Sequence, residues 1–195
     1  MNKTAIIIPS RLEAVRLPNK PLKLINNKEM ILHVYEAAKK TNTGEVYVAT
    51  PDQKIIDLVK ENGGKAVRTS LDHQTGTDRV YEVFQNQLKR EPNIVVNLQG
   101  DMPNIDPNAI SNLVDYMNKG YCDIGTLASS FNSSEEIADV NNVKVTVKNK
   151  LENHQFGIAT DFFRIGEKNH KNFYHHVGIY AFTNKALVRY VSLKR

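Results

Sequence analysis

The sequence predicts an α/β fold with a mainly parallel central sheet and a mixed β extension. Up to about residue 120, apolar strand-like runs alternate with amphipathic helix-like segments, the pattern of a sheet with right-handed helical crossovers. The first run, residues 5–8, is continuously apolar, as in a strand covered on both faces. After Gly120, strand-like runs follow one another with few helices between them. We expect one domain over residues 1–195, made of an α/β part (1–120) and a mixed β part (121–195).

The individual elements follow from apolar spacing and from turn residues. Apolar runs that are continuous or alternate with polar residues predict strands at 5–9, 45–50, 65–68, 94–98, 124–129, 143–147 and 177–182. Apolar residues at helical spacing predict a helix beginning near Met30, one between Pro51-Asp52 and Gly63-Gly64, one capped by Thr77, one starting at Asp106-Pro107, and short ones at 134–138 and 185–190.

Composition narrows the class of protein. Of the 195 residues, 41% are apolar and 24% charged, which excludes a mainly disordered chain. The formal charge of +5 favours anionic partners, but lysine and arginine form no long run, so nucleic-acid binding would rest on net charge alone. The single cysteine, Cys122, fits a reducing compartment. With neither a signal-peptide core nor a membrane-spanning run in the sequence, we expect a cytoplasmic protein without a membrane partner.

A proline-rich basic loop, residues 9–22, joins the first strand to the first helix. It carries three cations, Arg11, Arg16 and Lys20. In an open α/β sheet this loop lies at the carboxyl end of a strand, where ligands bind, so its charge indicates a polyanion such as a nucleoside triphosphate. The prolines stiffen the loop and lower the entropy lost on binding. The alternative is a solvated surface loop.

Gln99-Gly100-Asp101 directly follows the buried strand 94–98. An acidic side chain at this place points into the ligand cleft of such a fold, and a hard oxygen ligand there suits Mg²⁺ together with substrate phosphates. The alternative is a turn aspartate that binds nearby backbone N–H groups.

Two weaker candidates come from other loops. Thr75-Gly76-Thr77 lies at a helix start, where free N–H groups can bind anions or base edges, although a helix cap also explains Thr77. Arg79 could reach either the cleft or solvent. In the last long strand, His176 and Tyr180 share one face while His175 points away, which argues against chelation by the histidine pair. His176 is either a buried, hydrogen-bonded histidine or a substrate contact.

Three common motifs are absent from the sequence: G-x-S-x-G, G-x-x-x-x-G-K-[ST] and G-x-G-x-x-G. A serine hydrolase, a P-loop NTPase and a dinucleotide oxidoreductase are therefore disfavoured.

Residues 6–11 and 16–22 closely resemble the signature loop of the 3-deoxy-manno-octulosonate (Kdo) cytidylyltransferases, also called CMP-Kdo synthetases. Further matches follow in order along most of the chain, at residues 48–50, 72–79, 96–101, 142–145 and 176–180. The resemblance implies a three-layer Rossmann-like nucleotidyltransferase fold, with a nucleotide-binding part before residue 120 and a sugar-binding and dimerisation part after it. It also implies a cytoplasmic, Mg²⁺-dependent homodimer that transfers CMP from CTP to the anomeric hydroxyl of Kdo, giving CMP-Kdo and pyrophosphate for lipopolysaccharide biosynthesis.

Carried over residue by residue, the resemblance assigns the triphosphate to Arg11, Arg16 and Lys20, and the cytidine to Thr75, Gly76 and Thr77. It assigns Mg²⁺ to Asp101 and the sugar acid to Arg79, Gln99, His176 and Tyr180. Arg11, Lys20 and Asp101 are the expected catalytic residues.

The sequence departs from the family at three places. Met102 stands where an acidic or polar residue is usual, and residues 159–165 replace a Ser-Arg-x-x-Ile-Pro stretch. Beyond the position of Arg195 the family continues into a segment with a second magnesium aspartate, which we expect this chain to lack. Two alternative functions remain: a cytidylyltransferase for another acidic sugar (sialic-type or amino-Kdo), or a truncated, non-catalytic nucleotide-binding module.

Overall fold

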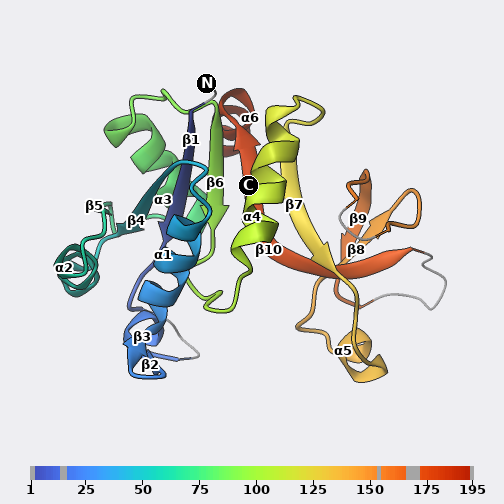
Figure 1. Cartoon of the computed structure of the whole chain (residues 1–195), viewed down its shortest axis with the longest axis horizontal. Coiled ribbons are helices and arrows are strands. Elements are labelled where there is room, and N and C mark those ends of the chain that lie inside the picture. Colours follow the sequence, from blue (N-terminus) through green and yellow to red (C-terminus); the bar gives the residue numbers. More distant parts are fainter. Residues whose placement is uncertain (1–2, 14–16, 153–154, 166–171, 194–195) are drawn as a thin grey trace. The chain divides into compact units, whose positions relative to one another are not determined.

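The structure, a computed structural model, describes residues 3–13, 17–152, 155–165 and 172–193 (Figure 1). It contains two compact units, the first formed by residues 1–125 together with 179–195 and the second by residues 126–178. This grouping differs from the expected division at residue 120, because the last residues of the chain join the first unit. No helix among the described residues is long and apolar enough to cross a bilayer.

The first unit is built on a mainly parallel sheet, as predicted. Strands β5 (Ala66–Arg68), β4 (Glu45–Thr50), β1 (Thr4–Pro9) and β6 (Ile94–Leu98) lie side by side and parallel. The final residues of β10 (Phe173–Thr183) pair antiparallel with β6. Every residue of β1 and β6 is buried, which explains their continuous apolar sequence.

Helices cover both faces of this sheet, giving three layers (Figure 1). Helices α1 (Met30–Lys40) and α4 (Pro107–Asn118) contact each other on one face. Helices α3 (Gly76–Glu82) and α6 (Asn184–Val191) lie together on the opposite face, where Ile7, Phe84 and Phe182 are part of one buried cluster. Helix α2 (Gln53–Glu61) packs against β4 and β5.

The second unit, residues 126–178, is a mixed β structure and is shorter than the expected mixed β part, residues 121–195. It contains most of β7 (Ile124–Ser129), the short helix α5 (Ser134–Ala138), strands β8 (Lys144–Val147) and β9 (Ala159–Phe163), and the first half of β10. Strand β8 pairs antiparallel with both β9 and β10. Strand β9 is absent from the predicted elements, because its residues are almost all exposed and show no apolar alternation; backbone pairing with β8 makes it a strand.

Local turn chemistry adds three features. The β2 (Leu24–Ile25) and β3 (Lys28–Glu29) hairpin turns through Asn26 and Asn27, both with positive φ. A short 3₁₀ helix, η1, covers Lys20–Leu22. A π-helix, η2 (Val83–Gln87), follows α3 directly.

The expected cap of the third helix is wrong. Thr75, and not Thr77, is the N-cap of α3. The reason is the capping box: Asp78 stands three residues after Thr75, and each side chain accepts from the other residue's backbone N–H.

Candidate functional site

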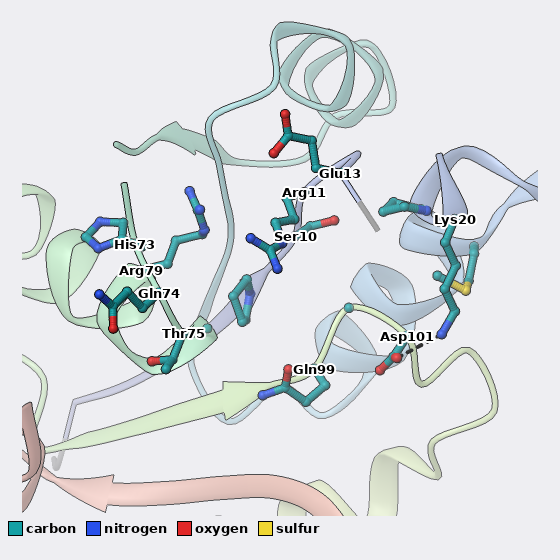
Figure 2. Close-up of a pocket in the computed structure, with 15 residues that line it drawn as sticks. Ser10, Arg11, Glu13, Lys20, His73, Gln74, Thr75, Arg79, Gln99 and Asp101 are labelled. Carbon is teal, nitrogen blue, oxygen red and sulfur yellow. Dashed lines mark hydrogen bonds and ion pairs between the residues drawn. The ribbon is translucent and has the colours of Figure 1, made fainter. Parts of the chain in front are cut away.

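A pocket of about 310 Å³ lies where β1 and β6 end, at the carboxyl edge of the parallel sheet. This is the edge at which ligands bind in open α/β sheets. All of its lining residues belong to the first unit. Of the predicted site residues that the structure describes, seven line it: Arg11, Lys20, Thr75, Gly76, Arg79, Gln99 and Asp101. Figure 2 shows Lys20 and Asp101 on one side of this pocket, His73, Gln74, Thr75 and Arg79 on the other, and Ser10 and Arg11 between them.

The basic loop is fixed at its base by backbone contacts. Ser10 N–H donates to the Ala49 carbonyl at 2.9 Å, which extends the pairing of β1 and β4 into the loop. Asn19 N–H donates to the Leu12 carbonyl at 3.1 Å, so the chain that leaves β1 is tied to the chain that enters η1. These contacts hold Arg11 and Lys20 near the sheet edge. Arg16, the third predicted cation, lies outside the described residues.

Lys20 and Asp101 form an ion pair on one side of the pocket, with Lys20 Nζ at 2.8 Å from Asp101 Oδ2 (Figure 2). Asp101 is exposed and follows β6 after Gly100. A Cβ on Gly100 would lie 3.0 Å from the Pro9 carbonyl oxygen, so glycine permits the end of β6 to run close beside the end of β1. That close approach brings the basic loop and the carboxylate into one site.

Behind the pocket, the fully buried Asn97 of β6 links two predicted site residues. Its amide Nδ2 donates to Thr77 Oγ1 at 3.1 Å, and its Oδ1 accepts from Gln99 Nε2 at 3.1 Å. Gln99 lines the pocket, whereas Thr77 is not one of the described lining residues and supports the wall through Asn97. In the sequence, Asn97 is only an interruption of an apolar strand, so this role was not predicted.

Arg79 is a buried cation in the pocket wall, with 3% of its surface exposed. Its guanidinium Nη1 donates to Thr69 Oγ1 and, at 2.8 Å, to the Ser70 carbonyl. Burial and then the charge of Arg11 lower the pKa of Arg79, while the carboxylates of Glu82 and Asp52 oppose that shift. Arginine nevertheless stays protonated in proteins, so the wall carries a fixed positive charge. The sequence allowed Arg79 to lie in the cleft or in solvent, and the structure places it in the pocket wall.

Several lining residues were not singled out from the sequence, among them Ser10, Glu13, His73 and Gln74. The signal was present, because Ser10, His73 and Gln74 fall inside the motifs that carry the family resemblance. The hydroxyl of Ser10 is buried and is one of two buried side-chain oxygens without a hydrogen-bond partner among the described residues. A buried polar atom of this kind in a pocket wall is suited to contact a polar ligand. His73 Nε2 contacts Glu82 Oε2, which also accepts from Ser70 N–H at 2.9 Å.

His176 belongs to the second unit and is buried there. Its Nε2 lies 2.9 Å from Thr126 Oγ1, and that hydroxyl donates to the Val177 carbonyl at 3.2 Å. Because the hydroxyl proton is used in that way, we assign the imidazole proton to Nε2. Burial, and secondarily His175, lowers the pKa of His176, which favours this neutral form. His176 is thus buried and hydrogen-bonded, and its contact with the sugar acid stays a prediction.

The two neighbouring histidines have different surroundings, as strand alternation predicted. His175 stacks on Phe131 with ring centroids 5.4 Å apart. Phe162 and His176 pack in a T-shaped arrangement, with ring centroids 5.1 Å apart. Tyr180 lies further along β10, within the first unit and opposite Asn97 of β6. Tyr180 is partly buried, its pKa is raised by burial, and it is not among the described residues that line the pocket.

The charges in the pocket suit a phosphorylated ligand. Among the described residues, three cations, Arg11, Lys20 and Arg79, line it together with two carboxylates, Glu13 and Asp101. The described residues contain no group of three or more His, Cys, Asp or Glu side chains that could hold a metal ion. Mg²⁺ in nucleotide sites usually takes one or two carboxylates together with phosphate oxygens and water, and Asp101 could be such a carboxylate.

Comparison with known proteins identifies the family of this chain. Residues 5–195 match the family model described as Cytidylyltransferase. The 3-deoxy-manno-octulosonate cytidylyltransferase of Rhodopseudomonas palustris (strain HaA2) is 38% identical over 98% of this chain and 78% of the relative. That of Brucella ovis is also 38% identical, over 98% of this chain and 76% of the relative.

A solved structure of a protein with the same activity in its name is also similar to this chain. The CMP:2-keto-3-deoxy-manno-octonic acid synthetase complexed with CTP superimposes with a TM-score of 0.86 at 38% identity, covering 99% of this chain and 79% of that one. The three-layer Rossmann-like nucleotidyltransferase fold expected from the sequence is thereby confirmed. The chain belongs to the cytidylyltransferase family, among the 3-deoxy-manno-octulosonate cytidylyltransferases.

Proposed function

We propose that this chain transfers CMP from CTP to the anomeric hydroxyl of Kdo and releases pyrophosphate, giving CMP-Kdo for lipopolysaccharide biosynthesis. The observation that carries the proposal is the pocket at the ends of β1 and β6, in which Arg11, Lys20 and Asp101 meet. It belongs to a chain that is 38% identical to a synthetase solved with CTP.

The reaction needs no protein nucleophile. The anomeric oxygen forms a bond to the α-phosphorus of CTP and releases its proton to solvent water, while the bond from that phosphorus to the oxygen of the β-phosphate breaks and pyrophosphate leaves. Negative charge increases on the equatorial and leaving oxygens. Arg11 and Lys20 face the triphosphate and stabilise that charge, and the rigid Arg79 adds a fixed positive charge in the wall. Alignment of the two substrates supplies much of the remaining rate enhancement.

The cytidine is assigned to the wall made by Thr75 and Gly76, with Thr77 supporting it through Asn97. The sugar acid is assigned to Arg79 and Gln99 of the pocket, and to His176 and Tyr180 of β10. Because His176 is neutral at physiological pH, it would act toward the sugar as a hydrogen-bonding group and not as a cation.

Mg²⁺ is the proposed cofactor, held by Asp101. Its carboxylate is exposed in the pocket and one of its oxygens already contacts a cation, Lys20, so the site accepts positive charge. Mg²⁺ there would neutralise charge on the phosphates during transfer. The Met102 side chain offers no oxygen ligand, so phosphate oxygens and water would be further ligands beside Asp101.

The proposed assembly is a homodimer in the cytoplasm. Strand β9 is the last strand in the order of its sheet, and Phe162 on it is 47% exposed. Ile158 and Ile165 next to it are also exposed. An edge strand with exposed apolar side chains is suited to pairing with a second copy. Light scattering after size exclusion should give twice the mass of one chain.

The test is an assay with CTP, Kdo and Mg²⁺ that follows pyrophosphate release and identifies the sugar nucleotide by mass spectrometry. CMP-Kdo should form, and chelation of Mg²⁺ should abolish turnover. Sialic acid and 8-amino-Kdo serve as competing sugar acids, because residues 159–165 depart from the family pattern. Preference for either would correct the substrate. Calorimetric binding of CTP without turnover of any sugar acid would identify a nucleotide-binding module instead.

A further inference from the structure

The carboxylate of Asp52, outside the pocket, is hydrogen-bonded to the base of the basic loop. Asp52 Oδ2 accepts the Leu12 backbone N–H at 2.8 Å, in a partly buried contact between residues forty positions apart. The carbonyl of the same Leu12 accepts from Asn19 N–H. Leu12 therefore stands at the point where the loop closes, with Arg11 immediately before it and Lys20 immediately after Asn19.

This contact is unusual for an aspartate at that position. Asp52 is the N-cap residue of α2, where an aspartate side chain normally accepts an N–H of its own helix. Here the side chain makes no such cap; its backbone carbonyl receives the Ile55 and Ile56 N–H groups, and its carboxylate reaches Leu12. Thr50, which is fully buried, holds the residue in place, since its hydroxyl accepts Asp52 N–H at 3.2 Å.

We propose that Asp52 is a positioning residue for nucleotide transfer, which fixes the base of the basic loop through the Leu12 N–H and so presets Arg11 and Lys20 for the triphosphate. The expected effect on CTP kinetics rests on the proposed function, whereas the expected effect on the Leu12 hydrogen bond does not. A charged acceptor makes the Leu12 hydrogen bond stronger than a neutral one. Without this hydrogen bond, CTP has to order the loop as it binds. The apparent affinity for CTP is then the intrinsic affinity multiplied by the fraction of chains whose loop is already in place.

Three variants separate this role from helix capping and from charge. Asp52→Ser keeps an oxygen suited to an N-cap but is one bond too short to reach Leu12. Asp52→Asn keeps an acceptor of full length and removes the charge. Asp57→Ser is the matched control, because Asp57 lies on the same helix, is exposed, and contacts Gln53 instead of the loop.

The first measurement is hydrogen exchange of the Leu12 amide, which requires no activity. We expect exchange about tenfold faster in Asp52→Ser, at most about threefold faster in Asp52→Asn because its acceptor is neutral, and unchanged in Asp57→Ser. Equal protection of Leu12 in the wild type and in Asp52→Ser would overturn the proposal, whatever reaction the protein performs.

The second measurement is the division between KM and kcat. Asp52→Ser should raise KM for CTP about tenfold, change kcat less than about twofold, and leave KM for Kdo unchanged. Asp52→Asn should stay within about threefold of wild type in all three constants.

A purely structural role would instead lower the melting temperature and kcat with KM unchanged, and would contradict the proposal. An effect of Asp52→Asn as large as that of Asp52→Ser would also overturn it, because charge would then be responsible. If the wild type releases no pyrophosphate, the proposed function fails while the exchange result still decides the role of Asp52.

Discussion

Lys20 Nζ lies 2.8 Å from Asp101 Oδ2, and this contact joins the loop after β1 to the end of β6. The two side chains are 37% and 54% exposed, so the pair contributes little to stability. Its importance is chemical. In the proposed reaction, an incoming triphosphate would compete with Asp101 for Lys20, and the released carboxylate would then be available to a cation that accompanies the phosphates.

The first prediction concerns Lys20→Ala. The free energy of unfolding should change by less than about 1 kcal/mol, because the ion pair is exposed. kcat/KM for CTP should fall about a hundredfold or more, since a positioned cation is removed from the charge that grows in the transition state. Steady-state kinetics and urea unfolding measure the two quantities.

Lys28→Ala is the control for that variant. It breaks the ion pair of Lys28 with Glu36, whose side chains are 39% and 47% exposed, away from the pocket. Its free energy of unfolding should equal that of Lys20→Ala, and its kcat/KM for CTP should equal that of the wild type. Lys20→Ala with kcat/KM within about threefold of wild type would remove Lys20 from the proposed machinery.

The second prediction concerns Arg79. Arg79→Ala leaves Thr69 Oγ1 and the Ser70 carbonyl without their buried donor, so the free energy of unfolding should drop by about 2–3 kcal/mol. Arg90→Ala is the comparison, because Arg90 is exposed although it also donates to Tyr81 and Gln85. That variant should lose less than about 1 kcal/mol. Equal losses in the two variants would show that the contacts of Arg79 add no more stability than surface contacts.

The strands that carry the site could be predicted from the sequence, because strands buried on both faces of a sheet are continuous apolar runs. Residues 45–50 and 94–98 form strands with the bounds expected, and strand-end topology alone places the basic loop beside Asp101. Family motifs supplied the pocket wall at Thr75 and Gly76.

What could not be predicted depends on contacts between distant residues. Nothing local distinguishes Asp52 from an ordinary helix cap, since its partner is forty residues earlier. Asn97 looks like a flaw in an apolar strand until its amide is seen between Thr77 and Gln99. Strand β9 has no apolar alternation to reveal it, because most of its side chains face solvent.

The third prediction is a pH dependence that comes from His176. Its pKa in the folded chain lies below the ordinary value of 6.5, so the unfolded chain takes up the proton at higher pH than the folded chain does. Stability from this source is constant above about pH 6.5, declines as the pH falls below that value, and levels off once the folded-state pKa is passed.

His176→Gln tests that dependence, because the glutamine Nε2 can still donate to Thr126 Oγ1 while the titrating group is gone. The free energy of unfolding, measured from about pH 7.5 to about pH 5, should fall more steeply in the wild type than in the variant. Carboxylates affect both chains alike and cancel in the difference. Parallel curves would mean that His176 titrates at the same pH in the folded and unfolded chains.

The fourth prediction concerns Gly100→Ala. The added methyl group would lie 3.0 Å from the Pro9 carbonyl oxygen and 3.4 Å from Ile31 Cδ1. The isoleucine can rotate, but the backbone at the end of β1 is held by the hydrogen bond from Ser10 to Ala49, so the strand ends have to separate. We expect a loss of about 1–3 kcal/mol in the free energy of unfolding. Because Asp101 follows Gly100 directly, we also expect a fall of about tenfold in kcat/KM for CTP.

Gly76→Ala provides the comparison for stability. A Cβ there would lie 3.1 Å from Cγ of the Pro9 ring, which can change its pucker, and so the loss should be smaller than that of Gly100→Ala. If Gly100→Ala unfolds at the wild-type urea concentration and keeps wild-type kinetics, the close approach of β1 and β6 is not what brings Asp101 to the basic loop. A loss of stability with unchanged kinetics would separate the two effects and assign the position of Asp101 to its ion pair with Lys20.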